Sequence, residues 1–231
     1  MINSIKKYVR YLLDRFLPMF WYMNTSYSQD GEDIVLKNFF EDIKKTKGFY
    51  VDVGAHHPYR FSNTALFYKN GWNGINIEPT PSLFKKFTRL RKRDINLNIG
   101  ISNTQDSLNF YEFNEGAYNT FDASKVDSIL AKSPKYTLVN TQKIDLLPLS
   151  DIFSKYIHNR EIDFMSIDVE GLDYKVLLSN DWNTYRPKFI LVECYPDFDN
   201  INQDRIYHFL KGQNYEMVSY TYRTAFFKSI S

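Results

Sequence analysis

Paired cysteines, glycine-rich motifs and an excess of either charge are all missing from this chain of 231 residues. The single cysteine, Cys194, cannot form an internal disulfide, so it suits a reducing compartment and a packing role. A Gly-x-Gly-x-x-Gly motif is absent, and with it the glycines that place a pyrophosphate at a helix N-terminus, which argues against a dinucleotide. The 29 basic and 27 acidic residues nearly balance, so the field that attracts nucleic acid is missing and we expect no nucleic-acid partner.

A membrane-spanning or secretory segment is missing as well. Basic residues precede the aromatic stretch Phe16–Met23, but Asp14 and Arg15 interrupt the apolar core and Pro18 breaks it. No small-residue cleavage site follows, so neither secretion nor a transmembrane span is supported. We therefore expect a cytoplasmic protein.

Residues 1–26 are interpreted as a separate N-terminal extension. Five apolar residues recur there at helical spacing, and the basic residues lie elsewhere on the helical wheel, which predicts a short amphipathic helix. The five residues are Ile5, Val9, Leu12, Leu13 and Phe16. This helix could lie on a membrane surface as a peripheral contact, or pack on its own domain, or mediate dimerisation.

Strand-like and helix-like patterns alternate after residue 30, which predicts an α/β fold with a doubly wound, mostly parallel sheet. One domain over residues 27–231 is expected, because nothing marks a second one. The expected strands are Phe49–Val53, Gly74–Ile77, Ile95–Ile101, Ser107–Phe113, Ile162–Ile167, Pro187–Val192 and the terminal pair Tyr215–Tyr220 and Arg223–Lys228. The expected helices are Glu32–Lys44, Asn63–Lys69, Pro81–Arg91, whose charges including Arg91 are interpreted as solvent-exposed, Val176–Asn180 and Asp204–Lys211.

The segment Asn114–Lys143 interrupts this alternation. It is rich in Asn, Ser, Thr, Asp and Lys with only scattered apolar residues, which is typical of a long loop or insertion. Long loops in compact domains are often functional, so this insertion is a candidate for binding a substrate.

Acidic residues follow four of the apolar runs, at the point where each run ends. They are Asp52, Glu78, Asp168 and Glu193, and Gly54 follows the first. The carboxyl ends of parallel strands open onto the ligand crevice of a doubly wound sheet, so these acids should face one ligand. A carboxylate at Glu78 suits ribose hydroxyls, and the missing phosphate motif favours a nucleoside without phosphates, such as S-adenosylmethionine.

Several motifs in the same order resemble the FkbM-type S-adenosylmethionine-dependent methyltransferases, from about residue 27 to the end of the chain. The motifs are Tyr27-Ser-Gln-Asp-Gly-Glu-Asp33, Phe49-Tyr-Val-Asp-Val-Gly-Ala-His-His-Pro58, Ser62-Asn-Thr64, Gly71-Trp-Asn-Gly-Ile-Asn-Ile-Glu-Pro79 and Asp163-Phe-Met-Ser-Ile-Asp-Val-Glu-Gly171. The resemblance implies a seven-stranded class I methyltransferase fold of the Rossmann-like kind, with the cofactor over the first two strands. It also implies methyl transfer to an oxygen, commonly a hydroxyl of a sugar or natural product.

The same resemblance implies a set of cofactor-binding residues. One group surrounds the loop after the first strand, a second follows the second strand, and a third lies at the mouth of the site or at neighbouring strand and helix ends. The full set is Asp52, Gly54, Ala55, Glu78, Pro79, Gln29, Glu32, Asn63, Thr64 and Asp168.

Three residues are candidates for proton transfer. Asp168 and Glu170 follow the fourth strand, where a carboxylate could accept the proton of an acceptor hydroxyl. Alternatively Asp168 and Glu193 could hold a divalent metal, or Asp168 could simply bind cofactor or cap the following helix. His57, next to His56 in the loop after the first strand, could act as a base instead because a histidine titrates near neutrality.

These observations predict an S-adenosylmethionine-dependent O-methyltransferase that modifies a small polar acceptor, with a sugar in a glycan or nucleotide-sugar pathway as the first choice. A natural-product or lipid-linked acceptor is the alternative substrate. A non-catalytic S-adenosylmethionine-binding or adaptor protein on the same fold is the alternative function. Acceptor choice is expected to reside in the Asn114–Lys143 insertion, where Asn114, Glu115, Tyr118, Asn119 and Thr120 mix polar and aromatic groups.

Overall fold

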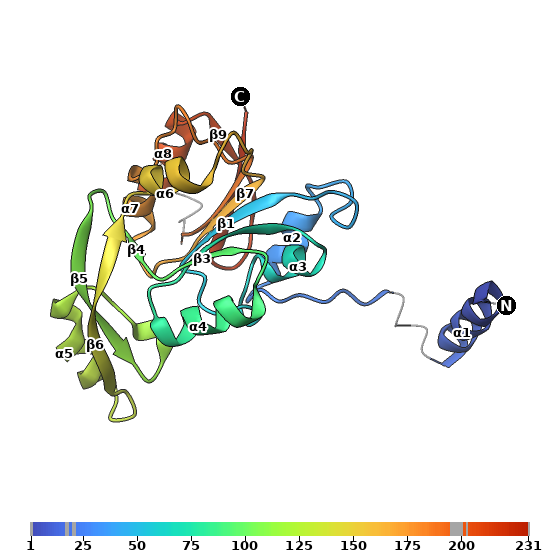
Figure 1. Ribbon diagram of the computed structural model, residues 1–231, viewed down its shortest axis with the longest axis horizontal. Coiled ribbons are helices and arrows are strands. Elements are labelled where there is room, and N and C mark those ends of the chain that lie inside the picture. The colour runs from blue at the N-terminus through green and yellow to red at the C-terminus, as the bar shows by residue number, and fades with distance from the viewer. Residues whose placement is uncertain (1, 17–18, 20–21, 195–200, 202, 231) are drawn as a thin grey trace.

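The computed structural model describes residues 2–16, 19, 22–194, 201 and 203–230. Its largest sheet has seven strands in the order β3-β2-β1-β7-β8-β10-β9 (Figure 1). The strands are β1 (Phe49–Val53), β2 (Asn73–Ile77), β3 (Ile95–Leu97), β7 (Phe164–Ile167), β8 (Phe189–Glu193), β9 (Tyr215–Tyr220) and β10 (Thr224–Ser229). Strands β3, β2, β1, β7 and β8 pair in parallel, and β10 is antiparallel to both of its neighbours. The predicted α/β fold with a mostly parallel seven-stranded sheet is confirmed.

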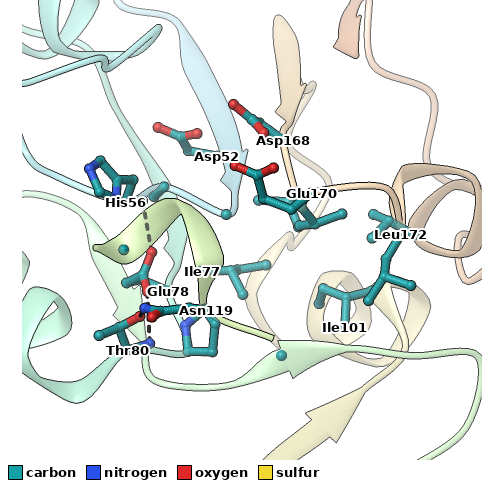
Figure 2. Close-up of a pocket in the computed structure, with 18 of the residues that line it drawn as sticks. Asp52, His56, Ile77, Glu78, Thr80, Ile101, Asn119, Asp168, Glu170 and Leu172 are labelled. Carbon is teal, nitrogen blue, oxygen red and sulfur yellow. Dashed lines mark hydrogen bonds between the residues drawn. The ribbon is translucent and has the colours of Figure 1, made fainter. Parts of the chain in front are cut away.

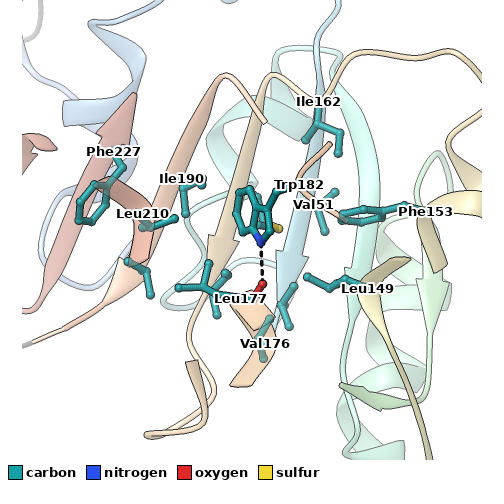
Figure 3. Packing of buried hydrophobic residues seen from close by; sticks show 14 of the residues in the cluster. Val51, Leu149, Phe153, Ile162, Val176, Leu177, Trp182, Ile190, Leu210 and Phe227 are labelled. Atoms are coloured by element: carbon teal, nitrogen blue, oxygen red, sulfur yellow. Dashed lines mark hydrogen bonds between the residues drawn. The ribbon is translucent and has the colours of Figure 1, made fainter. Parts of the chain in front are cut away.

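One face of the sheet packs on three helices. These are α6 (Leu149–Tyr156), α7 (Asp173–Leu178) and α8 (Arg205–Gly212), whose buried apolar residues join a cluster with Val51, Met165 and Ile190 of the strands. Figure 3 shows Trp182 inside this cluster, with its indole nitrogen donating to the carbonyl of Leu177 at 2.9 Å. The indole is therefore buried with its one polar group satisfied, which fits a core role.

The opposite face packs on α2 (Glu32–Lys37) and α3 (Ala65–Lys69). Here the strands contribute Tyr50, Phe164 and Leu191, each next in sequence to a residue of the first cluster. Successive side chains of a strand point to opposite faces, so both faces of the sheet are covered and the fold is doubly wound. Cys194 is buried at the end of β8, and desolvation raises the pKa of its thiol to about 12, which agrees with the expected packing role.

The helix predicted over Glu32–Lys44 is too long. Helix α2 ends at Lys37, and the chain then turns. Tertiary packing explains the early end, because the ring of Phe40 lies edge-on to Trp72 at 5.0 Å and the carbonyl of Ile43 accepts from the Trp72 indole at 3.0 Å. Continuing the helix would have moved Phe40 and Ile43 away from this aromatic core.

The prediction that Arg91 belongs to a solvent-exposed face is wrong. Helix α4 (Pro81–Leu90) ends just before Arg91, and the side chain of Arg91 is fully buried. The guanidinium donates to the carbonyl of Pro58, to the hydroxyl of Tyr50 and to the hydroxyls of Ser62 and Thr64 at 3.0–3.2 Å. A buried charge needs such partners, and here they tie α4 to the loop that follows β1.

The single strand predicted over Ile95–Ile101 is two strands in two sheets. Asn98 separates β3 from β4 (Gly100–Ile101), and its amide nitrogen donates to the carbonyls of Glu78 and Pro79 at 2.9 and 2.8 Å. These two hydrogen bonds of the Asn98 side chain hold the chain at the point where it leaves the large sheet. Strand β4 then pairs with β6 (Leu138–Leu147).

The segment predicted as a long loop, Asn114–Lys143, is largely regular. It contains the 3₁₀ turn η2 (Gly116–Tyr118), helix α5 (Ala123–Lys132) and the first half of β6, which pairs antiparallel with β5 (Asp106–Phe113). Together β4, β6 and β5 form a second, three-stranded sheet. The side chains of β6 are exposed or half-buried up to Lys143, so this part of the strand has no apolar alternation by which the sequence could reveal it.

The N-terminal helix α1 (Ile2–Phe16) confirms the predicted helical extension, and in Figure 1 it stands apart from the sheet. The division between residues 26 and 27 stays a prediction. In the described part of the chain, no helix combines the length and apolarity needed to cross a bilayer.

Candidate active site

A cavity of about 300 Å³ opens at the carboxyl ends of β1, β2 and β7 (Figure 2). Strand β1 lies between β2 and β7. After β1 the chain forms β2 on one side of it, and it later returns to form β7 on the other side. In doubly wound folds this switch point is where ligands bind. Acids from three strand ends, Asp52, Glu78 and Asp168, line the cavity together, whereas Glu193, the fourth acid expected to face the same ligand, does not.

The loop after β1 needs a glycine at position 54. Gly54 has a φ of +77°, and a Cβ there would lie 1.9 Å from the carbonyl oxygen of Asp168. The amides of Gly54 and Ala55 both donate to the carbonyl of Ile77, at 3.0 and 3.1 Å. The loop is therefore pressed between the ends of β2 and β7, and its backbone forms part of the cavity wall.

Glu78 is held by backbone groups on either side of its carboxylate. One oxygen accepts from the amide of His56 and the other from the amide of Thr80, both at 2.7 Å (Figure 2). A carboxylate offers about four acceptor positions, so two remain for a ligand. Desolvation raises the pKa of Glu78 to about 7.

Asp52 is the second buried acid. Its carboxylate accepts from the hydroxyl of Thr64 at 2.7 Å, and desolvation raises its pKa to about 6 although Thr64 and the nearby Arg91 oppose the shift. Thr64 itself does not line the cavity and acts through Asp52. Asn63 does line it, and its amide donates to the hydroxyl of Ser166 on β7 at 3.0 Å.

Asp168 and Glu170 project from the segment after β7 and remain accessible through the cavity. Desolvation, followed by repulsion from Glu193 and Glu170, raises the pKa of Asp168 well above its ordinary value. Desolvation and repulsion from Glu193 and Asp173 likewise raise the pKa of Glu170. The segment is braced by Asp173, whose carboxylate accepts from the amides of Val169 and Gly171 at 3.1 Å.

Backbone strain concentrates at this cavity. Among the described residues, five other than glycine have positive φ, and three of them, His56, Phe61 and Glu170, line the cavity. The other two are asparagines, which tolerate this conformation, whereas a bulky residue such as Phe61 does not. Strained residues of this kind cluster at functional sites, so the backbone marks the same location as the acids.

Of the two neighbouring histidines, His56 lines the cavity and His57 does not. The Nδ1 atom of His57 accepts from the amides of Tyr59 and Arg60 at 3.2 and 3.1 Å, which gives this ring a structural part in the loop. Desolvation lowers the pKa of both histidines. A proton-transfer role for His57 stays a prediction that this geometry does not favour.

Two other predicted residues lie outside the cavity. Glu32 is buried, and its carboxylate accepts from the amide of Asp30 at 2.8 Å and from the hydroxyls of Thr221 and Thr224 at 3.2–3.3 Å, so it holds the N-terminal segment to the end of the chain. Glu193 lies on a neighbouring cavity that also contains Asp173 and Cys194. Gln29, in contrast, lines the main cavity and its amide oxygen accepts from the Arg223 guanidinium.

The insertion forms one wall of the cavity. It contributes Glu115, Gly116, Asn119, Thr120, Phe121, Asp122 and Lys125. Asn119 fixes this wall in place, since its Oδ1 accepts from the amide of Phe113 at 2.8 Å and its Nδ2 donates to Thr80 Oγ1 at 3.2 Å. Thr80 also bonds to Glu78, so the insertion is coupled to the predicted ribose carboxylate.

Sequence reasoning missed several lining residues. The apolar ones include Ile77, Ile99, Ile101, Phe110, Leu172 and Val176, and the cationic ones are Arg60 and Arg223. Their scattered positions in the sequence give no signal, except that Ile99 and Ile101 continue the alternation of apolar residues that begins in β3. An apolar surface beside the buried carboxylate of Glu78 suits a heteroaromatic base.

Among the residues that the structure describes, no group of three or more histidines, cysteines or acids is arranged to hold a metal ion. The divalent metal considered for Asp168 and Glu193 therefore stays a prediction without structural support.

Comparison with known proteins gives the family. A model described as the methyltransferase FkbM domain matches residues 52–217. The chain therefore belongs to the FkbM methyltransferase family, which supports a methyl-transfer role. No curated protein matches.

Solved structures with a similar fold include the methyltransferase FkbM from Methylobacillus flagellatus KT, with 13% identity and a TM-score of 0.47 over 94% of this chain and 59% of that one. This chain thus spans less than two thirds of that protein. A putative rRNA-methylase from Clostridium thermocellum has 12% identity and a TM-score of 0.46, covering 90% of this chain and 99% of that one. The delta-N METTL16 MTase domain has 9% identity and a TM-score of 0.41, covering 86% and 82%.

Proposed function

We propose that this methyltransferase uses S-adenosylmethionine to methylate a hydroxyl of a small polar acceptor in the cytoplasm, with a sugar of a glycan or a nucleotide sugar as the acceptor class. The observation that carries the proposal is the carboxylate of Glu78. Two backbone amides hold it at the end of β2, and it keeps two acceptor positions free beside the Gly54 loop. A ribose diol, with two neighbouring hydroxyl donors, matches those positions.

The residues of the cavity fit the rest of the cofactor. Ile77, Ile99 and Ile101 offer an apolar surface for the adenine, and the backbone of Gly54 and Ala55 lets the chain approach the ligand closely. When bound, S-adenosylmethionine supplies a methyl group on a cationic sulfur. The acids that line the cavity suit that positive charge.

The acceptor hydroxyl must lose a proton as its oxygen bonds to the methyl carbon and the carbon–sulfur bond breaks, with its electron pair passing to sulfur. Among the exposed carboxylates that line the cavity, Asp168 and Glu170 follow β7 next to the Gly54 loop, so we assign the proton to one of them. Burial raises the pKa of both carboxyls above their ordinary values, and a carboxylate with a raised pKa is a stronger proton acceptor. Positioning of the two reactants supplies much of the remaining acceleration.

The acceptor is assigned to the insertion wall. Glu115, Asn119 and Lys125 offer charged and amide groups for hydroxyls, and Phe121 offers aromatic surface. This combination suits a sugar, because paired hydrogen bonds orient it and a ring face packs on the aromatic side chain. Natural-product and lipid-linked acceptors present similar hydroxyls and remain in the test panel.

Calorimetry with S-adenosylhomocysteine and with NAD tests the cofactor, and a turnover screen over nucleotide sugars, glycans and lipid-linked sugars tests the reaction. Binding of S-adenosylhomocysteine with methylation in the screen supports the proposal. Binding of NAD in its place overturns it. Cofactor binding without turnover across the whole panel favours the adaptor alternative, and loss of turnover with a chelator indicates the metal.

With the acceptor identified, the double variant Glu115→Ala/Lys125→Ala should raise its KM by about tenfold, the effect of one lost charged hydrogen bond, while affinity for S-adenosylhomocysteine stays the same. The matched control is Asp127→Ala, because Asp127 is an exposed residue of helix α5, which also carries Lys125. An unchanged KM in the double variant would contradict the assignment of this wall to the acceptor.

A further inference from the structure

Helix α1 carries an apolar face that no residue described in the domain covers. Within Ile2–Phe16, Ile5 is 59% exposed, Val9 47% and Phe16 69%. The helix stands apart from both sheets in Figure 1. Apolar surface of this extent is unfavourable when it is exposed to water, so we expect a binding partner to cover it.

Charge identifies the occupant. The helix contains one acid, Asp14, and four basic residues, Lys6, Lys7, Arg10 and Arg15. Its net charge is therefore +3. At roughly 100° per residue, Lys6 and Arg15 fall on the two borders of the apolar face. Long cationic side chains at such borders can reach phosphate groups while the residues between them enter an acyl layer.

A second copy of the helix fits less well. The narrow seam Ile5, Val9, Leu12 and Phe16 repeats for only two heptads, fewer than the three to four that mark a coiled coil. Tyr8 and Leu13 also widen the face beyond such a seam. Pairing would in addition bring two +3 helices together.

We propose that α1 docks this methyltransferase on an anionic membrane surface, lying in the plane of the headgroups. The exposed residues that follow the helix extend the same chemistry, since Met19 is 73% exposed, Tyr22 84% and Met23 69%. Tyrosine at the membrane–water boundary is favourable because its ring is apolar and its hydroxyl polar. The site in the sheet would thereby work next to a membrane, whatever its acceptor.

Vesicle co-sedimentation of the full chain tests the electrostatic contribution of α1 to membrane binding. Binding is expected to equimolar phosphatidylcholine and phosphatidylglycerol, to be much weaker on pure phosphatidylcholine, and to fall with added salt. The variant Lys6→Glu/Lys7→Glu should reduce partitioning by about 25-fold or more, since each lysine near the surface contributes about fivefold. The matched control Lys44→Glu/Lys45→Glu makes the same change in net charge on another exposed pair and should partition like the parent.

A second pair of variants tests the contribution of the apolar face of α1 to membrane binding. Val9→Asp places a carboxylate in the apolar face and should abolish binding, while Ser4→Asp makes the same charge change on the polar face and should reduce it by no more than about fivefold. Affinity for S-adenosylhomocysteine should match the parent in all four variants. No sedimentation with anionic vesicles, or equal losses in both members of either pair, would overturn the proposal. So would a dimer that Val9→Asp converts to monomer, because α1 would then cover a second copy.

Discussion

Replacement of Glu78 by glutamine gives the sharpest test of the cofactor site. The glutamine keeps the size of the side chain but has one oxygen where the carboxylate has two, and it carries no charge. Hydrogen bonds to a charged group contribute about 1.5–3 kcal/mol each, so the loss of one should weaken S-adenosylhomocysteine binding by about 2–3 kcal/mol, or roughly 30–150-fold, above pH 8. The backbone amide left facing the glutamine nitrogen adds to that loss.

The effect should depend on pH in a specific way. Burial raises the pKa of Glu78 to about 7, so below that pH the free protein must release a proton before the carboxylate can accept from two ribose hydroxyls. Each pH unit below about 7 therefore weakens parental binding by up to about 1.4 kcal/mol. At about pH 5.5 the parent has lost roughly 2 kcal/mol, and its affinity should approach that of Glu78→Gln.

Isothermal calorimetry of both proteins with S-adenosylhomocysteine across this pH range measures the effect. Asp52 and Asp168 also titrate but are present in both proteins, so the ratio of the two dissociation constants isolates Glu78. Asp163→Asn is the matched control, because Asp163 accepts from the amide of Phe49 at 2.8 Å at the opposite edge of the same sheet. A ratio near one at high pH, or a ratio that does not change with pH, would refute the assigned role of Glu78.

Three further predictions follow from the same geometry. The pKa values of Glu78 and Asp52 are raised in the folded protein, so their contribution to the unfolding free energy of the ligand-free protein should be largest below about pH 4 and fall up to about pH 7; urea titrations of the parent and of Asp52→Asn/Glu78→Gln measure it as a difference, and a difference that is flat or rises with pH would contradict it. Asp168→Asn should lower kcat by at least about 100-fold while S-adenosylhomocysteine affinity changes only a few-fold, and near-normal turnover would exclude Asp168 as the base. Gly54→Ala should abolish cofactor binding and lower Tm, because its Cβ would meet the Asp168 carbonyl, whereas Gly212→Ala, with nothing within 4 Å, should keep both properties.

The sheet and the acids at its edge could be predicted because their signals are local. Apolar runs such as Phe49–Val53 are buried along their whole length, and each ends at a carboxylate that the parallel topology must bring to the same edge. The number of strands came from the family resemblance, and their order was not predicted, since periodicity does not determine which strands are neighbours.

Of the second sheet, the sequence predicted strand β5 as Ser107–Phe113, but not its pairing with β6 or the structure of the insertion, because these depend on non-local contacts. Strand β6 shows no apolar alternation before Ile144, and helix α5 buries only Ile129. Helix α6 is different: Leu149, Ile152 and Phe153 have helical spacing and are buried, so its signal was present and was missed. The end of α2 at Lys37 depends on where Phe40 must pack, which no local pattern contains.

We expect the acids of the site to stabilise a bound ligand at the expense of the stability of the empty fold. Asp52 and Glu78 are buried, Asp168 and Glu170 lie near Glu193, and within this set the raised pKa values reflect desolvation and mutual repulsion. A core of similar volume without these carboxylates would fold at less cost. We expect a cation and a pair of hydroxyl donors to complete the site, because such a ligand would compensate for gathering these acids at a strained loop. The proposed cofactor supplies both, with its sulfonium charge and its ribose, and that complementarity connects the electrostatics of the empty pocket to methyl transfer.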